Sequence, residues 1–176
     1  MRGTILTVLT CLSWTWLACH AATASSDARC GKYVASGMRA LTVNEMAPDD
    51  REAFMKRSSG GQPGCVEVDF NADGLKDPAL IVQDRNSGVV SLIVALAKKG
   101  GGFTVALQKP LGSSFDGLYL AAHSATSVEP TDAVDSTQES RNLKGGAVDL
   151  VFVEKATVVY YWDDAASKIA ELQSGD

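Results

Sequence analysis

The sequence predicts a mainly β (α+β) fold, an antiparallel sheet meander preceded by one or two short N-terminal helices. From residue 65 onward, apolar residues recur with period two or in short runs. Clusters of Gly, Pro, Asn and Asp separate these runs, as turns do. Only the segment 48–57 carries the charge pattern of a complete helix. With 45% apolar residues, the chain is expected to form one β-rich domain over residues 25–176.

The first 24 residues have the organisation of a secretory signal peptide. Arg2 supplies a positive start, an apolar run covers Ile5 to Leu17, and small residues lead to a cleavage site near Ala24. The run is shorter than the roughly 20 apolar residues of a membrane-spanning helix. We therefore expect a periplasmic or secreted protein with no transmembrane segment after cleavage. The alternative is a lipoprotein anchored through Cys19.

Charge and cysteine content fit an exported protein. Cleavage removes one of the 16 basic residues and none of the 21 acidic residues, which leaves a net charge of −6. An acidic chain without a Lys/Arg cluster argues against a nucleic-acid partner. Cleavage also leaves Cys30 and Cys65 as a pair, and in an oxidising compartment such a pair usually forms one disulfide. Closing a loop of about 35 residues would stabilise the fold by about 4 kcal/mol in the chain-entropy model.

Helices are expected only near the N-terminus. Pro48 suits a first helical turn, acidic residues follow it, and basic residues end the segment, so a helix is predicted over Pro48 to Arg57. A second, short helix is considered around Tyr33 to Leu41. Beyond residue 64 the chain is expected to be β, with one long solvated loop over His123 to Leu143. The predicted strands are Cys65–Phe70, Pro78–Val82, Val89–Ala97, Phe103–Leu107, Gly117–Ala121, Ala147–Glu154, Thr157–Trp162 and Ile169–Gln173.

A loop inside the stretch 65–84 has the pattern D-x-N-x-D-G-x-x-D, which aims several oxygen atoms at one point. Oxygen ligands on alternate residues of a tight loop are what calcium prefers. An EF-hand would need a bidentate Glu where this chain has Leu80, and Pro78 blocks a following helix, so the prediction is a strand-loop-strand site. The alternative is a metal-free turn rich in Asx residues. The predicted calcium ligands are Asp69, Asn71, Asp73, Asp77 and the carbonyl of Leu75.

The segment Val-Asp-Phe-Asn-Ala-Asp-Gly-Leu-Lys-Asp-Pro-Ala-Leu-Ile-Val resembles the calcium loop of FG-GAP/VCBS-type repeat proteins. In that family the loop binds calcium between two strands of a propeller blade. The chain departs from the pattern at Ala72, where the family has Gly, and it contains a single copy, so a full propeller is not implied. The tail Val158 to Asp163 is similar to the ends of small exported bacterial proteins with one such loop. Some of these are periplasmic immunity proteins, which implies an inhibitor of an envelope-targeting toxin.

Catalytic motifs are absent from the sequence after cleavage. His123 is then the only histidine, which excludes a zinc site rich in histidine and leaves a Ser-His-Asp triad without support. We therefore expect a binding module and not an enzyme. The alternatives are an envelope hydrolase that uses Asp163, Asp164 or the loop carboxylates, and a purely structural envelope protein. An acidic surface would suit a basic toxin or hydrolase as partner, and the expected partner-binding residues are Tyr160, Tyr161 and Trp162.

Overall fold

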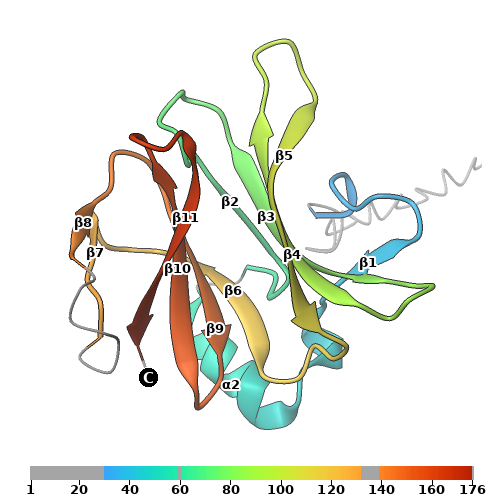
Figure 1. Cartoon of the computed structure of the whole chain (residues 1–176). Helices are drawn as coiled ribbons and strands as arrows, with labels where there is room; N and C mark the ends of the chain where they lie inside the picture. Colours follow the sequence, from blue (N-terminus) through green and yellow to red (C-terminus); the bar gives the residue numbers. More distant parts are fainter. Residues whose placement is uncertain (1–29, 59–60, 132–138, 176) are drawn as a thin grey trace, which may run out of the picture.

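The structure is a computed structural model that describes residues 30–58, 61–131 and 139–175. Two antiparallel sheets stand side by side, and one helix closes the space between them at one end (Figure 1). The prediction of a mainly β fold is confirmed. No helix within these ranges is long and apolar enough to span a membrane. The predicted signal peptide, including Cys19, lies outside the described residues.

The first sheet contains five strands in the order β1-β3-β4-β5, with β2 paired to β3. β2 pairs with the first half of β3 and β1 with its last residues, so both lie on the same edge of β3. The run from β3 to β5 is the predicted meander. The strands are β1 (Met38–Ala40), β2 (Cys65–Val68), β3 (Asp77–Asp84), β4 (Val90–Ala97) and β5 (Phe103–Gly112).

The second sheet is built from the C-terminal half of the chain in the order β11-β10-β9-β6. Its alternating β-branched and aromatic residues place one face against the first sheet. The strands are β6 (Leu118–Ala122), β9 (Val148–Phe152), β10 (Ala156–Asp163) and β11 (Lys168–Gly175).

The main core lies between the sheets. Ile81 and Leu92 of the first sheet and Leu150 and Tyr160 of the second belong to one buried cluster. Helix α2 (Pro48–Arg57) has the predicted bounds and adds the buried ring of Phe54, after the 3-10 turn η1 (Val43–Glu45). The Phe54 ring contacts the edge of Tyr119 at 5.5 Å between ring centroids. Helix α2 therefore closes one end of the core.

The helix considered around Tyr33 to Leu41 is wrong, because Met38–Ala40 form strand β1. The edge of β3 next to β2 offers free backbone groups, and a strand there also packs on a second apolar cluster that contains Leu80 and Val82. Pairing and burial thus outweigh local helix propensity.

The predicted solvated loop over His123 to Leu143 also needs correction. Its ends form β7 (Ser127–Val128) and β8 (Arg141–Asn142), which pair with each other. Val128 is buried with Val159 and Leu172 on the outer face of the second sheet. Residues 132–138 of this segment lie outside the described residues. The segment therefore partly covers the sheet.

Candidate functional site

The predicted calcium loop connects β2 to β3 and is folded by its own side chains. The two carboxylate oxygens of Asp69 accept hydrogen bonds from the backbone N–H groups of Asp73 (3.0 Å) and Gly74 (2.8 Å). The Asp73 carboxylate accepts one from the N–H of Leu75 at 2.8 Å, and the Asn71 side-chain oxygen accepts one from Asp73 at 3.2 Å. These are successive Asx turns, the local structure that Asp and Asn favour.

Two residues of this loop have left-handed backbone conformations. Gly74 has a φ of 86°, which glycine adopts without steric cost, and Ala72 has a φ of 57°. A left-handed alanine costs roughly 1–2 kcal/mol. The departure from the FG-GAP/VCBS pattern therefore falls at a position where the backbone favours glycine.

Asp77 differs from the other carboxylates of the loop because it is fully buried, with 0% of its surface exposed. Its carboxylate accepts hydrogen bonds from the N–H of Phe70 (3.0 Å) and the N–H of Ala97 at the end of β4 (2.7 Å). Burial raises the pKa of Asp77, these two hydrogen bonds oppose the rise, and the charges of Asp73 and Asp69 add to it. Asp77 thus holds the loop to the end of β4.

The donor set fits calcium in its chemistry, since every predicted ligand offers an oxygen atom, Leu75 through its backbone carbonyl and the others through their side chains. The arrangement of these ligands in the structure fits a calcium ion less well than their chemistry does. Within the described ranges, no group of three or more His, Cys, Asp or Glu side chains is arranged to hold a metal ion. Calcium binding in this loop would therefore need the Asn71 and backbone oxygens as well as the carboxylates, with Asp69 and Asp73 turned from their backbone partners toward the ion.

Both sheets contact the loop. The N–H of Gly146 donates to the carbonyl oxygen of Asp69 at 2.5 Å. A Cβ atom on Gly145 would lie 2.2 Å from the carbonyl oxygen of Phe70, so only glycine fits there. The segment that leads into β9 therefore packs directly on the loop backbone.

The predicted disulfide between Cys30 and Cys65 is confirmed. Cys65 is the first residue of β2 and lies four residues before Asp69. The disulfide joins the start of the described chain to the strand that enters the loop. One end of that strand is covalently anchored, and the other carries the loop.

The aromatic residues expected to bind a partner are mainly core residues. Tyr160 and Tyr161 are 1% and 8% exposed, because β10 is an inner strand that contributes to both the main core and the cluster under β7. Trp162 is half-buried and packs against the main core. The prediction that Tyr160 and Tyr161 bind a partner is therefore wrong, because both side chains are buried.

The two acidic residues of the hydrolase alternative lie where β10 ends, with Asp163 as its last residue and Asp164 as the first residue of the turn to β11. Asp163 accepts hydrogen bonds from the N–H groups of Ala165 (2.9 Å) and Ala166 (3.2 Å). Asp164 forms an exposed ion pair with Lys144 at 2.9 Å. Asp163 thus stabilises the turn, and Asp164 forms a surface ion pair, as polar residues at the tip of a hairpin commonly do.

Sequence reasoning missed an ionic cluster around the buried carboxylate of Asp149 in β9. Its carboxylate contacts Arg57 of helix α2 at 2.7 Å and Nδ1 of His123 at 2.7 Å. His123 is only 14% exposed, and its Nε2 lies 3.1 Å from the carbonyl oxygen of Ser127. The only sign of this cluster in the sequence was the position of Asp149, an ionisable residue within the otherwise apolar strand β9. The cluster ties helix α2, β9 and the segment after β6 together.

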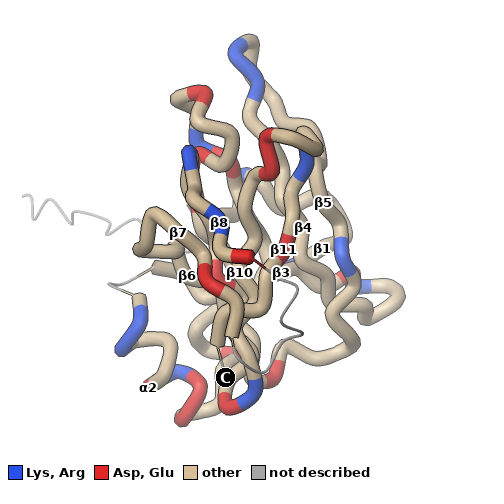
Figure 2. The backbone as a smooth tube through the Cα atoms, turned by 60° about the vertical axis from the view of Figure 1, so that its left-hand side comes forward, with Lys and Arg blue, Asp and Glu red and all other residues tan. Residues whose placement is uncertain are grey.

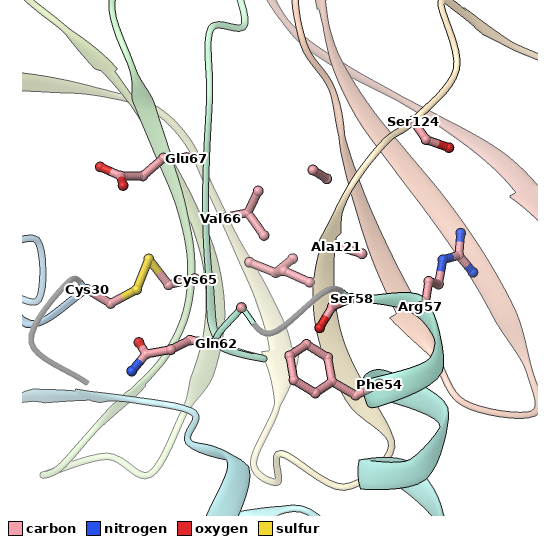
Figure 3. A pocket seen from close by; sticks show the side chains of 13 residues that line it. Cys30, Phe54, Arg57, Ser58, Gln62, Cys65, Val66, Glu67, Ala121 and Ser124 are labelled. Atoms are coloured by element: carbon pink, nitrogen blue, oxygen red, sulfur yellow. A yellow bond between two sulfur atoms is a disulfide. The ribbon is translucent and has the colours of Figure 1, made fainter. Parts of the chain in front are cut away.

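A cavity of about 480 Å³ lies beside this cluster, where the edge strands β2 and β6 of the two sheets approach each other (Figure 3). Val66 and Ala121 face each other across it, and Phe54 closes its base. The Ser58 hydroxyl oxygen, also in its wall, is buried and has no hydrogen-bond partner among the described residues. Comparisons with known protein families, with curated proteins and with solved structures find no match for this chain.

Proposed function

We propose that this protein is an exported binding module without catalytic activity, whose Asp69–Asp77 loop takes up one calcium ion as a structural element. The observation that carries the calcium proposal is the crowding of three carboxylates in one short loop. Asp77 is buried, and the negative charges of Asp73 and Asp69 add to the rise of its pKa. A cation in the loop would remove that repulsion. With three carboxylates and no bidentate Glu, we expect a dissociation constant on the order of 10⁻⁴ M.

The surroundings of His123 support a function in binding and not in catalysis. His123 is the only histidine among the described residues, and both ring nitrogens face oxygen atoms, one from Asp149 and one from the Ser127 backbone. A general base needs a ring nitrogen that can reach a nucleophile or substrate. Asp163 and Asp164, the residues of the hydrolase alternative, are engaged in a turn and a surface ion pair.

The biological role that we propose is inhibition of an envelope-targeting toxin, the role of some of the small exported proteins whose ends resemble the tail Val158 to Asp163. The supports are the signal peptide predicted from the sequence, a disulfide, which suits an oxidising compartment, and the resemblance of the loop. The alternative is a purely structural envelope protein. Affinity purification from the periplasm distinguishes the two, since the inhibitor recovers a secreted or envelope hydrolase and the structural protein does not.

Thermal unfolding with calcium and then with a chelator tests the metal. Binding to the native state must raise the melting temperature. Asp73→Ala should lose this response, because it removes a loop carboxylate that makes only local hydrogen bonds. Asp116→Ala is the matched control, since Asp116 is an exposed acidic residue in the turn before β6, far from the loop in sequence. The calcium proposal fails if millimolar calcium leaves wild-type melting unchanged.

A further inference from the structure

We propose that the free edge of strand β5, at the tip of the β4–β5 hairpin, is a docking surface for an extended acidic segment of a partner protein. The inference rests on the proposed binding function and names the surface and the partner chemistry. We define the hairpin edge as Lys98, Lys99, Phe103, Thr104 and Val105. This hairpin projects beyond the rest of the first sheet (Figure 1).

The hairpin edge offers unpaired backbone groups. β5 is the last strand of its sheet, and within the described ranges no backbone hydrogen bond joins it to a strand other than β4. The N–H of Lys98 donates to the carbonyl oxygen of Gly102 at 3.1 Å. Because hydrogen-bonded and non-hydrogen-bonded pairs alternate in antiparallel strands, Phe103 and Val105 direct their N–H and C=O groups away from β4. Such groups are a template for an added strand.

Exposed apolar side chains accompany these backbone groups. Phe103 is 44% exposed and Val105 is 58% exposed. The two side chains lie on the same face of the strand, since they are two residues apart. The ring of Tyr33 meets Phe103 edge-on at 5.1 Å between ring centroids and so fixes its orientation. An added strand would find apolar contacts at alternate positions.

Charge decides which partner suits this edge. The sequence has no Asp or Glu between Asp84 and Asp116, although the whole chain carries a net charge of −5. The tip of the β4–β5 hairpin is the blue turn at the top of Figure 2, where Lys98 and Lys99 are both exposed. Neither lysine has an ion-pair partner in the described part of the chain. Acidic side chains of an incoming strand would pair with them.

A second copy of this chain is a less suitable occupant. Pairing of two β5 edges would bring their lysines together and also join two molecules that each carry a net negative charge. Further along β5 the edge is occupied, because Lys109 forms an ion pair with Glu171 of β11 at 2.5 Å. A register shift at Val94/Ala95 separates that part from the tip. The accessible edge is therefore short and lies beside the two free lysines.

Fluorescence anisotropy with two labelled peptides tests the proposal on the full chain. One peptide alternates Glu and Val, and the other alternates Lys and Val. We expect the acidic peptide to bind several-fold more tightly, with an affinity that falls as salt increases. Val105→Pro should abolish binding, because proline has no N–H to offer the added strand, whereas Val105→Ile keeps both that N–H and an apolar side chain and should bind like the wild type. Lys98→Gln with Lys99→Gln should remove the preference for the acidic peptide.

Three results would overturn the proposal. They are equal binding of the two peptides, unchanged binding by a folded Val105→Pro variant, and a concentration-dependent dimer in sedimentation that this variant abolishes. If Val105→Pro does not fold, the variant with Lys98→Gln and Lys99→Gln still tests the proposal, which fails if that variant keeps the preference for the acidic peptide. Affinity purification from the periplasm distinguishes a failure of this proposed surface from a failure of the proposed binding function. A periplasmic partner held equally by wild type and Val105→Pro refutes the surface alone, whereas recovery of no partner by the wild type refutes the binding function.

Discussion

Asp77→Ala is the sharpest test of how the loop is attached to the sheet. The change leaves the N–H groups of Phe70 and Ala97 without their carboxylate acceptor. A buried donor without a partner costs about 1–3 kcal/mol. Phe70 is buried and Ala97 is half-buried, so water can replace part of the second bond. We therefore expect the free energy of unfolding to fall by about 2–4 kcal/mol.

Denaturant unfolding in the presence of chelator measures this loss without any contribution from calcium. Asp84→Ala is the matched control, because the Asp84 carboxylate also accepts two backbone N–H bonds, from Asn86 (3.0 Å) and Ser87 (2.7 Å), but in an exposed turn. We expect a clearly smaller loss for the control. If the two variants lose the same stability, the buried carboxylate does not hold the loop as argued here.

The contributions of Asp77 and Asp84 to the free energy of unfolding should depend on pH with opposite sign. The pKa of Asp77 is raised, chiefly by burial, from an ordinary value of 3.8, so the pH-dependent part of its contribution to stability is complete below about that pH and is lost as pH rises through the raised value. The hydrogen bonds that the carboxylate accepts from Phe70 and Ala97 are a separate part of the contribution. The pKa of Asp84 is lowered, chiefly by the hydrogen bond from the N–H of Ser87. Its contribution is present above the ordinary value and is lost as pH falls through the lowered one. Unfolding of each variant against wild type across acidic pH should show this contrast, and parallel curves would contradict it.

Three further predictions concern contacts around the loop and helix α2. Replacing both disulfide cysteines by Ser should lower the free energy of unfolding by about 4 kcal/mol in denaturant titrations, and no loss would show that the disulfide does not restrain the unfolded chain. Gly145→Ala should destabilise the protein and weaken calcium binding in calorimetry, because its Cβ would meet the Phe70 carbonyl at 2.2 Å, whereas Gly31→Ala, with no atom within 4 Å, should change neither. Asp149→Asn should cost about 1–3 kcal/mol in thermal or denaturant unfolding, since it weakens two charge-assisted contacts, and wild-type stability would contradict the role of this cluster.

Local patterns were sufficient where one segment carried its own signal. Helix α2 matches its predicted bounds because Pro48, the acidic first turn and the basic last turn all act within ten residues. The disulfide could be predicted because only two cysteines remain after the expected cleavage. The loop after β2 was recognised for the same reason, since its turns depend on side chains within a few residues of each other.

Long-range pairing explains what local patterns missed. Strand β1 has only three residues and exists because β3 offers a free edge beside β2. Strand β7 forms where Val128 can cover the outer face of the second sheet. The burial of Asp149 depends on Arg57, 92 residues away, which supplies a compensating charge. None of these partners can be identified from neighbouring residues.

The sequence by itself determined the class of secondary structure, helix α2, the cysteine pair and the turn-forming loop with its Asp and Asn side chains, because each depends on residue types that the chain alone shows. Only the tertiary structure decided that the strands divide into two sheets, that Asp77 faces the backbone of β4 and that Tyr160 and Tyr161 are buried. It also left the outer edge of β5, beside the two lysines of the hairpin tip, without a second neighbouring strand among the described residues. The physical reason is that burial and free edges depend on which distant segments pack together, and alternation along one strand does not specify which face is covered.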